Sequence, residues 1–461
     1  MDFSAANAPL WNVVIQLGMI AGAILVANFL RQKIAFIRKS LMPTAVLAGF
    51  LLLLLKYLGV LPVDNAFYEM IVYHCIALGF IAMSLRVTKK ARERTGDLTG
   101  LKSGALIVST YLVQAVTGLI ITLLLAYTFM PGLFKASGLL LPMGYGQGPG
   151  QGNNIGSTYE ALGFAGGRSF GLAIAAAGYI CACVVGVILL NILARRGEVR
   201  AKGEAKPDEL GADFFQDKNE IPVSESLDKL SMQLAMILIV YLATYLVTWG
   251  LTSGIGALSP GLGGTVNTLL WGFNFIIGAA LAMLVRVVLQ KAQARGYMRR
   301  QYQNNYLLNR LSGFFFDLMI VAGIASIDLQ DLTGLWVPFI LLAVAGGVTT
   351  WLWLKWICRR VYKGYYYEGL ISMYGMMTGT IGSGILLLRE IDPDLSTPAA
   401  NNLVIGSSYG IIFGAPMLVF VGLASRSTLM CFVTFGMCIV YFAILLLVLL
   451  KAHGRRKKTE E

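Results

Sequence analysis

The chain contains one stretch that cannot form a regular helix although apolar segments flank it: Met143-Gly144-Tyr145-Gly146-Gln147-Gly148-Pro149-Gly150-Gln151-Gly152-Asn153-Asn154-Ile155-Gly156. Six of its fourteen residues are glycine and none is charged. Glycine and proline are the poorest helix formers, and proline also lacks a backbone N–H. At membrane depth, irregular backbone is tolerated only where protein buries it or water reaches it. We therefore predict a break in the helical structure here, called the first break.

A second, shorter break occurs late in the chain: Tyr374-Gly375-Met376-Met377-Thr378-Gly379-Thr380-Ile381-Gly382-Ser383-Gly384. Both stretches contain the pattern Tyr-Gly-x-x-x-Gly, and their tyrosines, Tyr145 and Tyr374, are 229 residues apart. The recurrence indicates that the chain consists of two related halves.

The composition is that of a membrane protein. Of the 461 residues, 57% are hydrophobic and 13% are charged, whereas about 25% are charged in an ordinary soluble domain. Apolar runs of about twenty residues recur along the chain, which predicts an all-α polytopic membrane protein. None of the six cysteines forms a Cys-x-x-Cys pair, so we expect neither a zinc site nor a disulfide framework.

The hydropathy pattern predicts about 11 membrane spans. We expect them near residues 10–30, 41–61, 70–85, 104–130, 170–193, 230–251, 265–289, 311–327, 335–354, 403–423 and 429–450. The first break precedes the fifth span, and the second break precedes the tenth.

Most of the 37 lysines and arginines fall in the connections after odd-numbered spans. By the positive-inside rule these connections are cytoplasmic, so we expect the N-terminus outside and the C-terminus inside. The same distribution accounts for the net charge of +13 without a nucleic-acid partner, and membrane lipid is the expected surrounding.

Each predicted half contains four spans, a break and a fifth span. Because five is odd, the second half starts on the opposite side of the membrane, which is the inverted-repeat pattern of secondary transporters. We expect the first repeat at 1–194, a cytoplasmic linker at 195–229, the inverted repeat at 230–425, and an extra helix with a basic tail at 426–461. Re-entrant hairpins are expected at about 138–163, open to the outside, and at about 366–391, open to the cytoplasm.

Helices that end inside a protein expose N–H groups at their starts and carbonyls at their ends. The N–H groups suit a substrate carboxylate, and the carbonyls suit Na⁺. The alternative is that the glycines only allow close helix packing. The predicted substrate-binding residues are Gly146, Gln147, Gly148, Gly150, Asn153, Asn154, Gly379, Thr380, Ser383, Arg389, Asn401 and Asn402. The candidate Na⁺ ligands are Asp317, Thr378 and Ser157.

Several of these residues have another interpretation. Asp317 is a costly charge within a predicted span, and it is either an ion ligand or a buried acid with a basic partner. Arg389 can bind a carboxylate through two parallel hydrogen bonds, or it can lie at the cytoplasmic mouth. The four asparagines can bind substrate or cap helices, and the hydroxyl groups can satisfy broken backbone. Glu160 is expected to support the first hairpin.

These motifs resemble a known family. Gly146-Gln147-Gly148-Pro149-Gly150 resembles the Gly-His-Gly-Thr-Gly motif of the bacterial sodium/glutamate symporter family. The second break, followed by Asn401-Asn402-Leu403, is similar to that family's second re-entrant loop. Further similarity lies in Met42–Gly49, Phe314-Phe315-Phe316 and Trp336-Val337-Pro338, and the likeness covers about residues 10–425.

The resemblance implies a homodimeric, Na⁺-coupled symporter of glutamate or a related amino-acid or carboxylate anion. One domain would carry the hairpins and move against a scaffold, as in an elevator, and Na⁺ would be the coupling ion with no other cofactor. Two features depart from the family: Gln147 stands where the motif has histidine, and the second break contains no histidine.

No catalytic motif of a zinc protease, a serine hydrolase or an ATP-driven pump occurs, so we do not expect an enzyme. Two alternatives stay open: a Na⁺- or proton-coupled transporter of another organic anion, and a passive anion channel or facilitator on the same scaffold.

Overall fold

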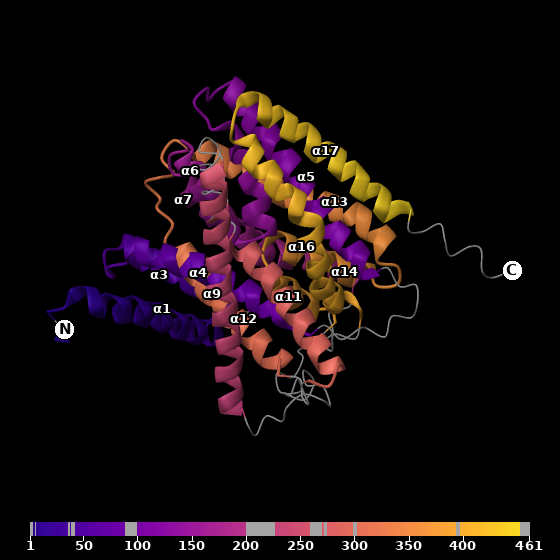
Figure 1. The fold of residues 1–461 in the computed structure, drawn as a ribbon. Coiled ribbons are helices and arrows are strands. Elements are labelled where there is room, and N and C mark those ends of the chain that lie inside the picture. Colours follow the sequence, from indigo (N-terminus) through magenta and orange to yellow (C-terminus); the bar gives the residue numbers. More distant parts are fainter. Residues whose placement is uncertain are drawn as a thin grey trace. The chain divides into compact units, whose positions relative to one another are not determined.

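The computed structural model describes residues 3–4, 6–35, 37, 42–87, 99–199, 226–258, 270–271, 274–297, 302–392 and 397–451. Within these ranges all regular structure is helical and no strand occurs (Figure 1). The prediction of an all-α protein is confirmed.

Among the described residues, nine helical segments are long and apolar enough to cross a membrane. They are α1 (Ala8–Lys33), α4 (Asn65–Leu85), α5 (Thr99–Tyr127), the continuous α7–η3–α8 (Gly167–Ile180, Cys181–Val185 and Gly186–Arg195), α9 (Ser226–Leu258), α11 (Asn274–Ala294), α12 (Asn305–Ala325), α13 (Trp336–Val361) and α17 (Thr428–Lys451). Helix α16 (Ala399–Ala424) bends by 46° and would make a tenth, while α3 (Thr44–Tyr57) is apolar but shorter. The protein is therefore an all-helical polytopic membrane protein.

A helix occurs at each of the expected spans, and the differences lie at the ends. Helix α1 begins at Ala8, before the expected start at residue 10, because the Asn7 side chain accepts a hydrogen bond from the Leu10 N–H and Pro9 fits the first turn. Helix α13 continues to Val361, beyond the expected end at 354. The span expected from residue 265 falls partly outside the described residues, as do 200–225 of the linker and 452–461 of the tail.

The chain divides into two compact units. Unit 1 contains Met1–Asp64, Arg94–Ala205 and Gly323–Glu461, and unit 2 contains Asn65–Glu93 and Lys206–Ala322. Each unit takes segments from both predicted halves. The repeats are thus not separate domains in space, and their boundaries and inverted topology stay predictions.

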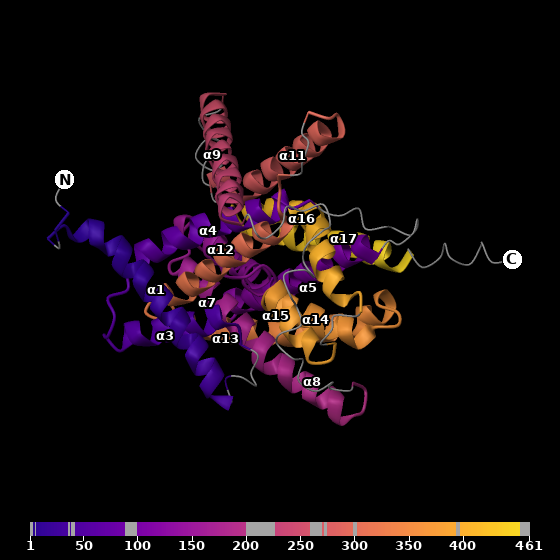
Figure 2. The same ribbon diagram turned by 90° about the horizontal axis from the view of Figure 1, so that it is seen from below.

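Helix α5 is the centre of unit 1, where it packs against α13, α16 and α17 (Figure 1). Glycines make the contact with α16 close: a Cβ added at Gly104 would overlap Tyr409, and one added at Gly406 would lie 2.8 Å from the Ser103 Cβ. Small residues allow such approach in membrane helix pairs. In Figure 2, α14 (Tyr366–Thr378) and α15 (Ile381–Arg389) lie beside α16.

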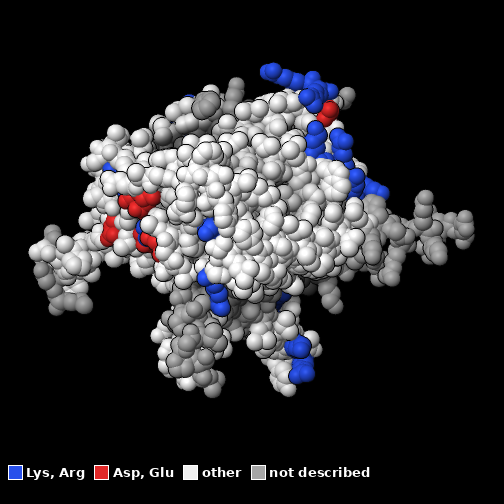
Figure 3. Space-filling model, turned by 90° about the horizontal axis from the view of Figure 1, so that it is seen from above, with Lys and Arg blue, Asp and Glu red and all other residues white. Residues whose placement is uncertain are grey.

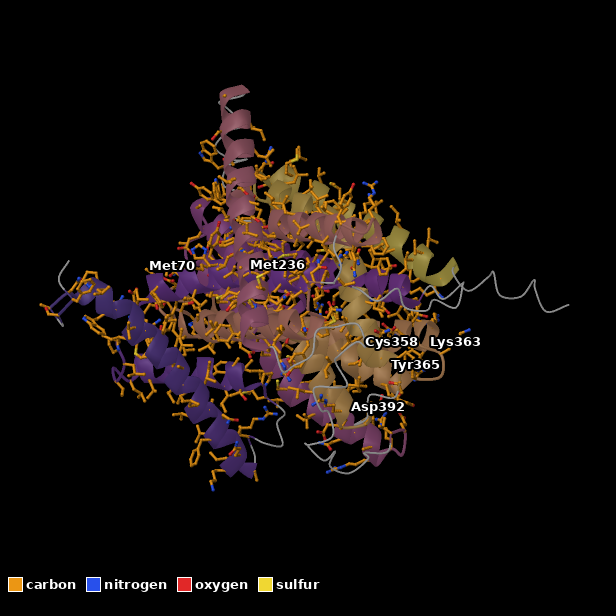
Figure 4. The ribbon with its side chains drawn as sticks, turned by 60° about the horizontal axis from the view of Figure 1, so that its bottom comes forward. Met70, Met236, Cys358, Lys363, Tyr365 and Asp392 are labelled. Carbon is orange, nitrogen blue, oxygen red and sulfur yellow. The ribbon has the colours of Figure 1, made fainter. Side chains whose placement is uncertain are left out.

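In unit 2, α4 packs against α9 and α11. Gly79 of α4 faces the Phe316 ring, and the Ser312 hydroxyl donates to the Gly79 carbonyl over 3.0 Å. Met70 of α4 and Met236 of α9, both in this unit, are labelled in Figure 4. The unit is held by interhelical packing with a few polar contacts.

Candidate substrate site at the two helix breaks

The first break lies between the π-helical turn η2 (Pro142–Gly146) and helix α6 (Pro149–Ala161). Gly148 caps α6 with φ +84°, a conformation that glycine adopts without strain. No side chain caps the start of α6. Its first N–H groups therefore lack an intrahelical or capping partner, and Pro149 has no N–H to satisfy.

The second break lies between α14 and α15. Helix α14 ends at Thr378, Gly379 leaves the helical conformation, and Thr380 is extended with φ −141° and ψ 173° before α15 begins at Ile381. No side chain caps the start of α15 either. Each break is therefore a helix end followed directly by an uncapped helix start.

The two breaks lie against each other within unit 1. A Cβ added at Gly148 would lie 3.9 Å from the Thr380 Cγ2 and 4.0 Å from the Gly379 carbonyl oxygen. A Cβ added at Gly178 of α7 would overlap the Thr378 carbonyl oxygen. Two segments more than two hundred residues apart in sequence thus form one junction, which we call the break junction.

Helix dipoles give the break junction both signs of partial charge. The starts of α6 and α15 carry partial positive charge, and the ends of η2 and α14 carry partial negative charge. Uncapped helix starts bind carboxylate and phosphate groups well. The break junction therefore presents partial charges of both signs at one place.

The structure brings a subset of the predicted residues together at the break junction. They are Gly146, Gln147, Gly148, Gly150, Thr378, Gly379, Thr380 and Ser383. The helix-capping residues, Gly148 and Thr380, are 232 residues apart rather than 229. On that register Gln151 corresponds to Ser383, since each is the third residue of its helix, and each has a buried side-chain oxygen without a hydrogen-bond partner.

Asn153 and Asn154 do not cap a helix, because α6 already begins at Pro149. Both are 4% exposed, and the Asn153 Nδ2 donates weakly to the Asn154 Oδ1 over 3.5 Å. The Asn153 Oδ1 and the Asn154 Nδ2 have no partner. The capping interpretation was wrong for this pair, and their role in binding stays a prediction.

Asn401, Asn402 and Arg389 lie away from the break junction. The Asn402 side chain donates to the Tyr365 hydroxyl over 2.8 Å, and Tyr365 precedes α14, at the open end of the second hairpin with Asp392 (Figure 4). Asn401 is exposed in the first turn of α16. Arg389 ends the nine-residue α15, which puts it roughly 12 Å from the start of that helix.

The three candidate Na⁺ ligands are on different elements. Ser157 is in the third turn of α6, beyond the helix start. Asp317 belongs to unit 2, where its side chain is exposed on α12. Thr378, by contrast, is at the junction, and its hydroxyl donates to the Tyr374 carbonyl over 2.8 Å.

The end of the first hairpin that is distant from the break is joined by hydrogen bonds to the loop after α12. The Glu160 carboxylate accepts from the Arg168 N–H over 2.9 Å, so Glu160 supports the turn between α6 and α7 as expected. The Ser169 hydroxyl donates to the Asp331 carboxylate over 2.7 Å. Tyr57 at the end of α3 donates to Asp328 over 3.1 Å. These bonds join α3, the loop and the hairpin within unit 1.

Sequence reasoning missed Gln114, which is fully buried on α5. Its Nε2 donates to the Met377 carbonyl and to the Thr350 hydroxyl, each over 2.9 Å. The available signal was a polar amide in the middle of an apolar span, because polar groups at membrane depth are costly and usually functional.

Comparison with known proteins gives no family for this chain: no family model and no curated protein matches it.

Proposed function

We propose that the protein is a secondary active transporter that binds a small organic anion at the break junction. The observation that carries the proposal is the meeting of two uncapped helix starts, α6 and α15, at one buried place. Transporters commonly bind substrate where discontinuous helices meet near the membrane midplane.

The substrate class follows from the partial charges. A carboxylate would accept from the N–H groups at the starts of α6 and α15. The ends of η2 and α14 offer carbonyl oxygens that suit an ammonium group or Na⁺. Sodium-coupled symport of glutamate or a related amino-acid or carboxylate anion would use both the N–H groups and the carbonyl oxygens, and it agrees with the motif resemblance.

Alternating access is the proposed mechanism. The first hairpin ends at the turn between α6 and α7, and the second has its open end near Tyr365 and Asp392. In an inverted-repeat topology these ends face opposite sides of the membrane, so that the site is reached past one hairpin and then past the other. A homodimer with an elevator-like movement in the bacterial cytoplasmic membrane belongs to the same proposal.

The surface is compatible with a membrane location. On the face drawn in Figure 3, most of the described surface is uncharged, and the lysines and arginines gather in separate clusters. Long aliphatic side chains are exposed on many helices, Leu25, Ile239 and Val440 among them. Exposed aliphatic side chains of this kind suit contact with lipid.

The test is transport by the purified full-length protein in liposomes. An inward Na⁺ gradient should drive accumulation of labelled glutamate, or of another amino acid or dicarboxylate, above its external concentration. A proton gradient in place of Na⁺ identifies the coupling ion. Equilibration without accumulation would instead indicate a passive channel or facilitator, and no flux of any amino acid or dicarboxylate would reject the proposal.

A further inference from the structure

The Gln114 side chain, on α5, lies close to both breaks. Its Nε2 donates to the Met377 carbonyl in the last turn of α14, just before the second break. Its Oε1 would lie 3.1 Å from a Cβ added at Gly146, the last residue of η2 before the first break. A single amide on α5 therefore lies between the two helix ends.

The Oε1 of Gln114 has no hydrogen-bond partner, and the residue is fully buried. The orientation of the amide is set by its neighbour: a carbonyl such as Met377 can only accept, so the atom that faces it must be the NH₂ group. An amide oxygen that is buried away from water without a partner destabilises the folded state. Such a group in a native structure calls for an explanation, for which a bound ligand or ion is one.

The surroundings of this oxygen favour a positive charge. It lies where η2 and α14 end, and helix ends carry partial negative charge. The amide's own donor, the Gln114 Nε2, is already used twice, so it does not compete for the Oε1. Gly146 has no room for a side chain, because a Cβ there would collide with the Tyr111 ring, so the backbone of the first break lies directly beside the amide.

We propose that Gln114 is the residue through which the site holds a cationic group. The amide oxygen either accepts from the ammonium group of an amino-acid substrate or coordinates the coupling cation. This proposal rests on the transport function proposed above. It adds a residue that binds the cationic group, while the helix starts bind the carboxylate.

The test compares the full-length wild type with Gln114→Leu and Gln114→Glu. Thr350→Val is the matched control, since it removes one bond to the Gln114 Nε2 and leaves the Oε1 in place. The readout is ligand-dependent thermal stability, which rises by mass action when a ligand binds the folded state. The probes are NaCl against choline chloride without substrate, and glutamate against glutarate, which lacks the ammonium group, at fixed NaCl.

We expect Gln114→Leu to weaken binding of the cationic probe at least about tenfold, since a hydrogen bond to a charged group is lost. Loss of the Na⁺ response alone identifies the coupling cation as the ligand, and loss of the preference for glutamate over glutarate identifies the ammonium group. Gln114→Glu keeps an acceptor and should retain the response, which covers the case in which the leucine variant does not fold. Thr350→Val should behave as wild type.

Two results overturn the proposal and leave the transport function intact: a Gln114→Leu protein that responds as wild type, or one that loses glutamate and glutarate equally with its Na⁺ response unchanged. A Gln114→Glu protein that folds and has lost the response also overturns it. A wild type that responds to none of the probes rejects the proposed function and this proposal together.

Discussion

Gly148 is the residue at which the first break is most sensitive to substitution. Its φ of +84° lies in the region where a side chain is strained, and its Cα faces Thr380 and Gly379 across the break junction. Strain of this kind costs about 1–3 kcal/mol. Any residue with a Cβ must therefore pay this strain or change the geometry of the start of α6.

We predict that Gly148→Ala lowers substrate transport about tenfold or more, because 1.4 kcal/mol corresponds to a factor of ten and the strain falls directly on the binding backbone. The measurement is the initial uptake rate in liposomes, divided by the amount of folded protein. Gly18→Ala is the control, since a Cβ at this exposed position of α1 meets nothing within 4 Å. Equal rates for Gly148→Ala and wild type would remove Gly148 from the site.

At the scale of the elements, α6 of the first hairpin packs against α7 through backbone contact. A Cβ added at Gly152 would lie 2.6 Å from the Gly171 carbonyl oxygen, and one added at Gly171 would overlap the Gly152 carbonyl oxygen. Gly156 and Gly167 repeat the arrangement one turn further along. The close-packing interpretation of these glycines is thus correct for one face of α6, while Gly148 lies at the break itself.

We predict that Gly152→Ala and Gly171→Ala each lower the free energy of unfolding by about 1–3 kcal/mol, as overpacking does. Because either methyl group separates the same two helices, the double variant should lose less than the sum of the single losses. Thermal unfolding of the four proteins in detergent measures the cycle. Additive losses would mean that the two glycines do not share a contact.

The helices were predictable because hydropathy is a property of a continuous segment. Their ends were less so: α13 runs on past 354 through Trp356, with Arg359 and Arg360 in its last turn, where cations suit the carbonyl end of a helix. The two breaks were predictable for the same local reason, since glycine and proline act on their own backbone.

The remainder of the candidate site depends on distances that sequence does not encode. Asn402 follows the second break by about twenty residues, yet the intervening α15 carries the chain to the other end of the hairpin, where Asn402 bonds Tyr365. Gln114 is 263 residues from Met377 and contacts it directly. The contact depends on the packing of α5 against α14, and no local sequence pattern predicts it.

At the scale of the whole molecule, the inverted-repeat proposal requires an odd number of membrane crossings in each half, and the extra C-terminal helix then places the two ends of the chain on opposite sides. The basic connections predict that the segment before α1 is outside and that the connection between α13 and α14 is cytoplasmic. Ser4 is exposed in the first of these, and Lys363, labelled in Figure 4, is exposed in the second. The two positions therefore test the topology directly.

We predict that Ser4→Cys is labelled in intact cells by a membrane-impermeant maleimide and that Lys363→Cys is labelled only after permeabilisation. The wild type serves as the background, because five of its six free cysteines are buried and Cys181 is only partly exposed. The reverse labelling pattern would mean that the protein has the opposite orientation in the membrane. It would leave the repeat proposal intact, since an odd number of crossings would still separate the two positions. Labelling of both cysteines from the same side would require an even number of crossings between residues 4 and 363, which would contradict the predicted topology.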